Sequence, residues 1–193
     1  MGREDFERAL VWHCAPVLVG LKAAGLLALP AESGRSLPGL AGRYNALLEE
    51  KGLRFLPLCR CGRRQLLLIY REEPLRRALE RPAARALLER AGYPVGAPLP
   101  RLLRKLMERV ERAEEFPHEI GLFLDYPPED VEGFLNDPGG MGCQLCGCWK
   151  VYHDAEGARR RFRQFRQCRD ALWARMERGS SLAQLMGMRP EAA

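Results

Sequence analysis

The sequence has no run of apolar residues near the roughly 18 that a helix needs to cross a bilayer. The longest candidate, residues 17–29, is interrupted by Lys22 and two glycines. The N-terminus, MGREDFER, is mostly charged and lacks the apolar segment of a signal peptide. We therefore expect a cytoplasmic protein with no membrane partner.

Glycine-rich phosphate loops and common catalytic signatures are also missing. There is no GxGxxG, Walker, GxSxG or kinase pattern, and His118-Glu119 lacks the second histidine of an HExxH zinc site. The sequence indicates none of these classes, and whether the chain is an enzyme stays open.

The remaining composition is ordinary for a globular protein, with 193 residues, 47% hydrophobic and 29% charged. One domain is expected at this length. We place it at residues 1–178, followed by a tail at 179–193. The net charge of +6 reflects many arginines, which is compatible with a soluble surface or an anionic partner.

Short periodic patterns predict an α+β fold. Two apolar runs, residues 54–58 and 65–70, flank a Gly-containing loop and predict a hairpin, and residues 148–153 predict a third strand. Since residues 66–69 are continuously apolar, that strand should be central and covered on both faces. The prediction is a small, mostly antiparallel three-stranded sheet surrounded by many helices. Helices are expected at residues 3–10, 16–27, 40–51, 74–91 (divided at Pro82), 99–113, 117–124, 128–135 and 155–178.

Seven cysteines are the main chemical feature. In a reducing compartment cysteines are metal ligands, redox groups or small buried hydrophobes. A knuckle-like segment carries Cys143, Cys146 and Cys148, and the hairpin loop carries Cys59 and Cys61. If the two loops meet, four thiolates suffice for Zn²⁺ or an iron–sulfur cluster. The first hypothesis is a metal- or redox-linked binding protein without catalytic turnover, and inert thiols are its alternative.

A second candidate site surrounds Cys14. Pro16 is typical of the first turn of a helix, and a thiol at a helix N-terminus has a lowered pKa. His13 or the distant His118 would be its acid–base partner, and Lys22 would bind an anion. This pattern indicates a thiol-dependent enzyme as an alternative function, set against a plain helix start with an inward-facing Cys14.

Residues 117–135 have the spacing of a helix-turn-helix unit. The second helix opens with acidic residues, among them Glu129 and Asp130, which a DNA duplex would repel. We therefore expect a packing unit and no nucleic-acid partner. His118 and Glu119 are candidate acid–base groups, although neighbours on a helix point about 100° apart. A capping or core-edge role for His118 is the alternative.

The last predicted helix, residues 155–178, has a basic face that includes Arg159, Arg160 and Arg163. Such a face favours a third function, a protein-interaction or regulatory domain that docks its partner through these arginines.

Three segments resemble one bacterial family. They are CAPVLVGLK at residues 14–22, FPHEIGLFL with the YP and DV that follow it at residues 116–131, and CWKVY at residues 148–152. In this order, over nearly the whole chain, they resemble a family of anaerobic bacteria known as domain of unknown function 3793. The resemblance implies no activity, but it implies that the three segments form a common core. His153 stands where that family has a glycine before the aspartate.

Overall fold

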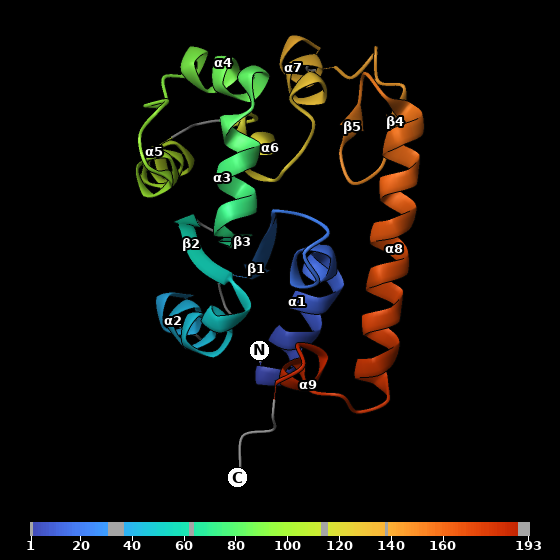
Figure 1. The fold of residues 1–193 in the computed structure, drawn as a ribbon. Helices are drawn as coiled ribbons and strands as arrows, with labels where there is room; N and C mark the ends of the chain where they lie inside the picture. Colours follow the sequence, from blue (N-terminus) through green and yellow to red (C-terminus); the bar gives the residue numbers. More distant parts are fainter. Residues whose placement is uncertain (1, 31–36, 62–63, 113–115, 138, 189–193) are drawn as a thin grey trace.

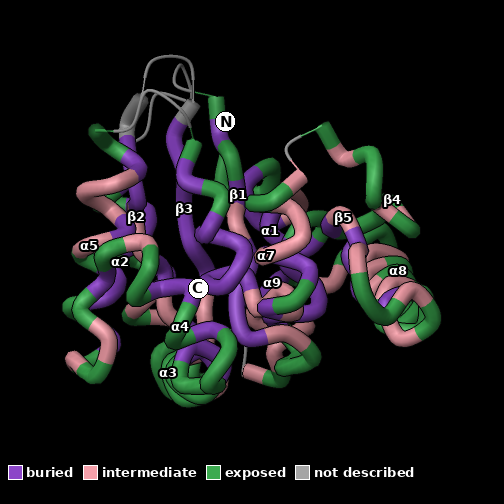
Figure 2. The backbone as a smooth tube through the Cα atoms, turned by 90° about the horizontal axis from the view of Figure 1, so that it is seen from above, coloured by how far each residue is buried: buried purple, intermediate pink, exposed green. Residues whose placement is uncertain are grey.

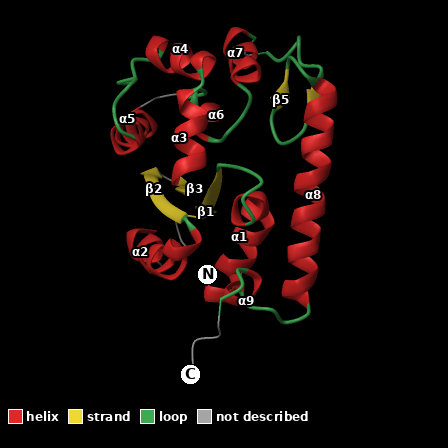
Figure 3. Ribbon diagram, viewed as in Figure 1, coloured by secondary structure: helices red, strands yellow, loops and turns green. Residues whose placement is uncertain are grey.

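The computed structural model describes residues 2–30, 37–61, 64–112, 116–137 and 139–188, without the side chains of residues 60, 61 and 64. Figures 1 and 3 show the arrangement of its elements. In chain order these are α1 (Arg3–Leu18), β1 (Ala24–Pro30), α2 (Leu37–Leu48), the 3₁₀ turn η1 (Glu49–Lys51), β2 (Leu53–Cys61), β3 (Arg64–Arg71), α3 (Glu72–Glu80), α4 (Pro82–Arg90), α5 (Leu99–Arg112), α6 (Ile120–Phe123), α7 (Pro128–Asn136), β4 (Leu145–Cys146), β5 (Lys150–Val151), α8 (Ala155–Glu177) and α9 (Leu182–Leu185).

The main sheet has three antiparallel strands in the order β1-β3-β2. Its central strand β3 is buried on both faces: Leu66 and Leu68 belong to one core cluster, Leu67 and Ile69 to the other. The α+β class, the hairpin and the position of its second strand are therefore confirmed. A strand covered on both sides needs no polar face, which is why its sequence does not alternate.

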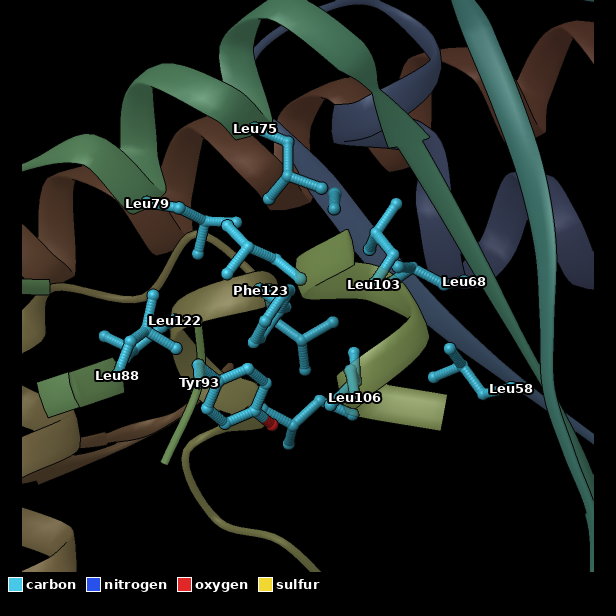
Figure 4. Packing of buried hydrophobic residues seen from close by; sticks show 14 of the residues in the cluster. Leu58, Leu68, Leu75, Leu79, Leu88, Tyr93, Leu103, Leu106, Leu122 and Phe123 are labelled. Atoms are coloured by element: carbon cyan, nitrogen blue, oxygen red, sulfur yellow. The ribbon is translucent and has the colours of Figure 1, made fainter. Parts of the chain in front are cut away.

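Each face of the sheet carries its own hydrophobic core, and purple buried segments run through the sheet in Figure 2. Helices α3 to α6 cover one face, where Phe123 and Tyr93 pack among leucines (Figure 4). Helices α1, α2, α8 and α9 cover the other face, centred on Phe6 and Tyr44. Leu182, in the predicted tail, is fully buried in this second core.

The third strand of the sheet is β1, which replaces the residues 148–153 that the sequence indicated. Most of β1 had been predicted as helix, because its alanines and leucines favour helices. Gly20, at φ 82°, lies in the turn that ends the preceding helix. Gly25 lets that helix approach the strand, since a Cβ there would lie 3.2 Å from the Cys14 sulfur. Tertiary packing therefore outweighs local propensity.

Helix α1 is continuous from Arg3 to Leu18, so the two separate helices predicted at residues 3–10 and 16–27 are wrong. Pro16 lies inside the helix but only two residues from its end. The guanidinium of Arg71 donates hydrogen bonds to the carbonyl oxygens of Val17 (2.8 Å) and Leu18 (2.6 Å). This buttress supports the last turn of α1 and fixes the direction of the chain that leads to Lys22.

Residues 148–153 form only the short strand β5, which pairs with β4 in a separate hairpin. The β4–β5 hairpin packs through Trp149 and Val151 on the N-terminal half of α8, against Ala158 and Phe162. Gly147 is required in its turn, since a Cβ there would lie 2.3 Å from the Phe162 ring. The aromatic and β-branched residues that indicated a strand thus anchor the hairpin to a helix.

The other predicted helices are confirmed to within a few residues. Pro82 separates α3 from α4, and Gly52, at φ 68°, closes the α2–η1 segment. In the described ranges no helix is long and apolar enough to span a bilayer.

Candidate functional site

A groove of about 630 Å³ lies between α1, the start of β1, the β4–β5 hairpin and residues 159–169 of α8. Figure 1 shows α8 running along the side of the molecule, with the hairpin at one end and α9 at the other. The volume lies within the range of small-molecule sites. Segments from both ends of the chain form its walls.

The groove is strongly basic. Lys22 lines it from one side, and four arginines of α8 line it from the other: Arg159, Arg163, Arg166 and Arg169. None of the described residues that line it is aspartate or glutamate. Arg169 pairs with Asp170 (2.8 Å), whereas Lys22 and the other three arginines have no carboxylate within ion-pair distance in the described part of the chain. The groove therefore holds positive charge that the described protein leaves largely uncompensated.

The sequence predicted Lys22 as an anion site and Arg159 and Arg163 as part of a basic face. It missed Arg166, although the spacing 159, 163, 166 places all three on one side of a helix. Arg160 lies outside the groove lining and is near Glu156 (3.7 Å). The predicted basic face is thus divided between the groove and the outer surface.

Lys22 follows the end of α1, where the backbone N–H groups of Leu21 and Lys22 both donate to the carbonyl of Pro16. Its half-buried ammonium lies 4.8 Å from the centre of the Tyr126 ring. Burial lowers the pKa of Lys22, and the nearby Cys14, Cys148 and Asp125 offset only part of that effect. An anion beside Lys22 would favour its charged form.

Tyr126 links the walls of the groove. Its ring stacks on Trp149 at 5.1 Å, and its hydroxyl donates to the carbonyl oxygen of Cys148 (3.1 Å). The neighbouring Asp125 accepts a hydrogen bond from the backbone N–H of Ala23 (3.0 Å). The segments at residues 14–22, 116–131 and 148–152 therefore meet here, as the family resemblance implied.

Asp130 holds the hairpin in place from α7. Its buried carboxylate accepts hydrogen bonds from Trp149 Nε1 (2.7 Å) and from the backbone N–H groups of Tyr152 (2.8 Å) and His153 (3.0 Å). The sequence suggested only that this carboxylate would repel DNA. Its structural role is to tie the β4–β5 hairpin to the body of the molecule.

The family described as protein of unknown function DUF3793 has a sequence model that matches residues 10–186. The chain belongs to the DUF3793 family. No curated protein and no solved structure matches it. The match covers every wall of the groove, so the groove is built entirely from the family domain.

Two thiols of this DUF3793 protein, Cys146 and Cys148, are exposed and line the groove on either side of Gly147. Cys143 is half-buried, and its thiol donates to the carbonyl of Leu145 (3.2 Å). The predicted knuckle thus places two of its three thiols at the basic groove.

The expected position of Cys14 at a helix N-terminus is wrong. Cys14 lies in the last half of α1 and is completely buried. Burial raises the pKa of its thiol to about 12, in spite of the nearby Lys22. The lowered pKa on which the thiol-enzyme hypothesis rested is therefore absent. His13 is exposed and lines the groove one residue away.

These positions predict the order of thiol reactivity. At pH 8, iodoacetamide should modify Cys146 and Cys148 of the folded protein about two to three orders of magnitude faster than Cys14, because thiolate and access are both needed. Mass spectrometry of peptides after timed quenching measures each rate. Unfolding in urea should abolish the difference. Fast modification of native Cys14 would contradict its burial.

His118 and Glu119 do not share a site. Glu119 is buried and accepts hydrogen bonds from Arg109 Nε (2.5 Å) and Tyr93 Oη (3.1 Å), which ties α5 and α6 together. His118 is exposed and contacts the ring of Phe134 edge-on at 4.9 Å. Neither residue lines the basic groove. The geometry gives Glu119 a structural role between α5 and α6, and it places His118 at the surface against Phe134.

The five-cysteine metal site is only partly described. Cys59 is buried in the core on the α3–α6 face and is disulfide-bonded, so its sulfur is not a thiolate ligand here. In Figures 1 and 2, β2 and the β4–β5 hairpin lie on opposite sides of the molecule. No group of three or more metal-ligating side chains occurs among the described residues. The side chain of Cys61 lies outside them, and zinc or iron binding stays a prediction.

Proposed function

We propose that this DUF3793 protein is a binding module that holds an anionic ligand in the groove between α1, the β4–β5 hairpin and α8. The observation that carries the proposal is the lining, in which Lys22 and four arginines face one cavity and none of the described lining residues is a carboxylate. Arginine guanidinium groups form strong, charge-assisted hydrogen bonds with anionic oxygens.

The shape of the site favours a small ligand over a protein partner. Arg159 and Arg163, which the sequence suggested as a docking face, line a concave groove rather than a flat surface. The half-buried Lys22 closes it from the other wall, and its lowered pKa indicates a desolvation cost that a bound anion would offset. A recessed cation supports recognition of a small anion.

Calorimetric titration with inorganic pyrophosphate at about 0.1 M salt tests the proposal. The double variant Arg163→Gln/Arg166→Gln should bind pyrophosphate at least about tenfold more weakly, since each lost hydrogen bond to a charged group costs about 1.5–3 kcal/mol. The matched control is Arg160→Gln/Arg161→Gln, which removes the same charge from the same helix outside the groove. Equal weakening in both variants would mean non-specific attraction and would refute the site.

A metal- or redox-linked role is a second candidate, supported by the exposure of Cys146 and Cys148 at this same groove. This candidate is tested by repeating the iodoacetamide alkylation of the folded protein in the presence of equimolar zinc. Protection of both thiols supports the candidate, and unchanged alkylation rates reject zinc binding at these residues.

A further inference from the structure

Aromatic side chains accompany the cations along the groove. Trp12, Tyr126, Phe162 and Phe165 all line it. Tyr126 has Trp149 and Lys22 against its ring, and Trp12 on α1 has Trp173 and Arg169 against its own, but these contacts leave Trp12 43% exposed. The exposed part of this indole lines the groove, where an aromatic ring offers a surface on which a ligand ring can stack.

Trp12 is also held rigidly. Its ring meets Trp173 edge-on at 5.0 Å, and the guanidinium of Arg169 lies 4.5 Å from its centre. Arg8 in turn lies over the Trp173 ring at 4.5 Å. Contacts of this kind fix the orientation of Trp12 before any ligand arrives, which lowers the entropic cost of stacking on it.

Lys22 and Trp12 lie at different levels of α8. Lys22 and Cys148 belong to the hairpin end, where Gly147 packs on Phe162. Trp12 belongs to the level of Arg169. Seven helical residues separate these two α8 positions, a rise of about 10 Å. One inorganic anion cannot occupy both ends, but a ligand with an anionic group and a ring at opposite ends can.

We propose that the ligand is a nucleoside phosphate, with its base stacked on Trp12 and its phosphates between Lys22 and the arginines of α8. The inference rests on the proposed anion-binding function and names the class of anion. Phosphate oxygens match the guanidinium groups, and every nucleobase has a face for stacking. The groove volume of about 630 Å³ suits a single small molecule rather than a long strand.

Parallel titrations with ADP, with inorganic pyrophosphate and with the oligonucleotide octathymidylate separate the outcomes. ADP should bind at least about tenfold more tightly than pyrophosphate, because only ADP has a base that can stack. Trp12→Ala should remove that preference and leave the pyrophosphate affinity within about twofold. Trp12→Phe, which retains a ring, should restore most of the preference. Since Trp12 is 43% exposed and lies outside both hydrophobic cores, neither variant should unfold the protein.

The remaining results overturn one or both proposals. Equal affinities for ADP and pyrophosphate in the unsubstituted protein refute the nucleoside and leave the anion-binding groove intact. If Trp12→Ala weakens the binding of ADP and of pyrophosphate equally, the nucleoside is likewise refuted and the anion-binding groove stands. No binding of either ligand refutes both proposals. Octathymidylate binding more than tenfold tighter than ADP would replace the free nucleotide with a nucleic-acid strand.

Discussion

Replacement of Asp130 by alanine is expected to lower the free energy of unfolding by about 3–5 kcal/mol. The carboxylate is 3% exposed and accepts three hydrogen bonds, from the Trp149 indole and from the backbone N–H groups of Tyr152 and His153. Alanine would leave the buried Trp149 indole N–H and two part-buried backbone N–H groups without their acceptor, and an unmet buried donor costs more than a hydrogen bond gains. Urea denaturation monitored by circular dichroism measures the change.

Glu129→Ala is the matched control, because this exposed carboxylate occupies the neighbouring position in the first turn of α7. It should cost less than about 1 kcal/mol. The fluorescence of Trp149 provides a local readout, since the indole would lose its partner in Asp130→Ala. A loss below about 1 kcal/mol in Asp130→Ala would show that hydrophobic packing alone positions the hairpin.

The parts of the fold that the sequence predicted correctly are those fixed by local chemistry. Proline and glycine mark element ends in ways that tertiary packing seldom changes, as at Pro82 and Gly52. In the α6–α7 unit, a Cβ at Gly121 would lie 2.9 Å from the Val131 side chain, so the two helices of the predicted packing unit do contact each other closely. These features need no knowledge of distant segments.

The strand β1 could not be found in this way, because its pairing is entirely long-range. Leu26 opposes Leu68 across more than forty residues of chain, and no β-branched residue in β1 indicates a strand. For residues 148–153 the prediction was wrong in the opposite sense, because they were expected as a strand of the main sheet and do not belong to it. Their strand-like composition serves a local hairpin, whose short loop closes at lower entropic cost than pairing with the distant sheet.

The candidate site was predictable in its chemistry but not in its assembly. Lys22 and the arginines at 159 and 163 were identified from charge and helical spacing. Trp12 was not, because it falls between the helices expected at residues 3–10 and 16–27, so it was assigned to no helix face. Cys14 was misplaced because Pro16 was interpreted as the first turn of a helix, whereas it lies inside α1, two residues from the end of that helix.

Replacement of Lys22 by methionine is expected to separate stability from binding. Methionine fills a similar volume without the ammonium, whose desolvation in the folded state lowers the pKa of Lys22. The variant should therefore be more stable near neutral pH by roughly 1 kcal/mol, because a desolvated charge without an ion-pair partner opposes folding. It should also bind pyrophosphate at least about tenfold more weakly, because one charge-assisted contact is lost. Urea denaturation and calorimetry measure the two effects.

The pH dependence gives a second test with a defined sign. The pKa of Lys22 is lower in the folded chain than its ordinary 10.5, so between the two values the unfolded chain binds more protons. The stability of the unsubstituted protein should therefore gain a contribution as pH rises through that window toward 10.5, and Lys22→Met should lack this contribution. Lys51→Met is the control, because it removes one positive charge outside the groove and should keep this pH-dependent contribution. The cation–π contact between the Lys22 ammonium and the Tyr126 ring acts against the desolvation cost, and it stabilises the folded protein by about 0.5–2 kcal/mol. If Lys22→Met is the less stable protein, that contact outweighs desolvation, and Lys22 is a structural residue rather than a cation held ready for a ligand.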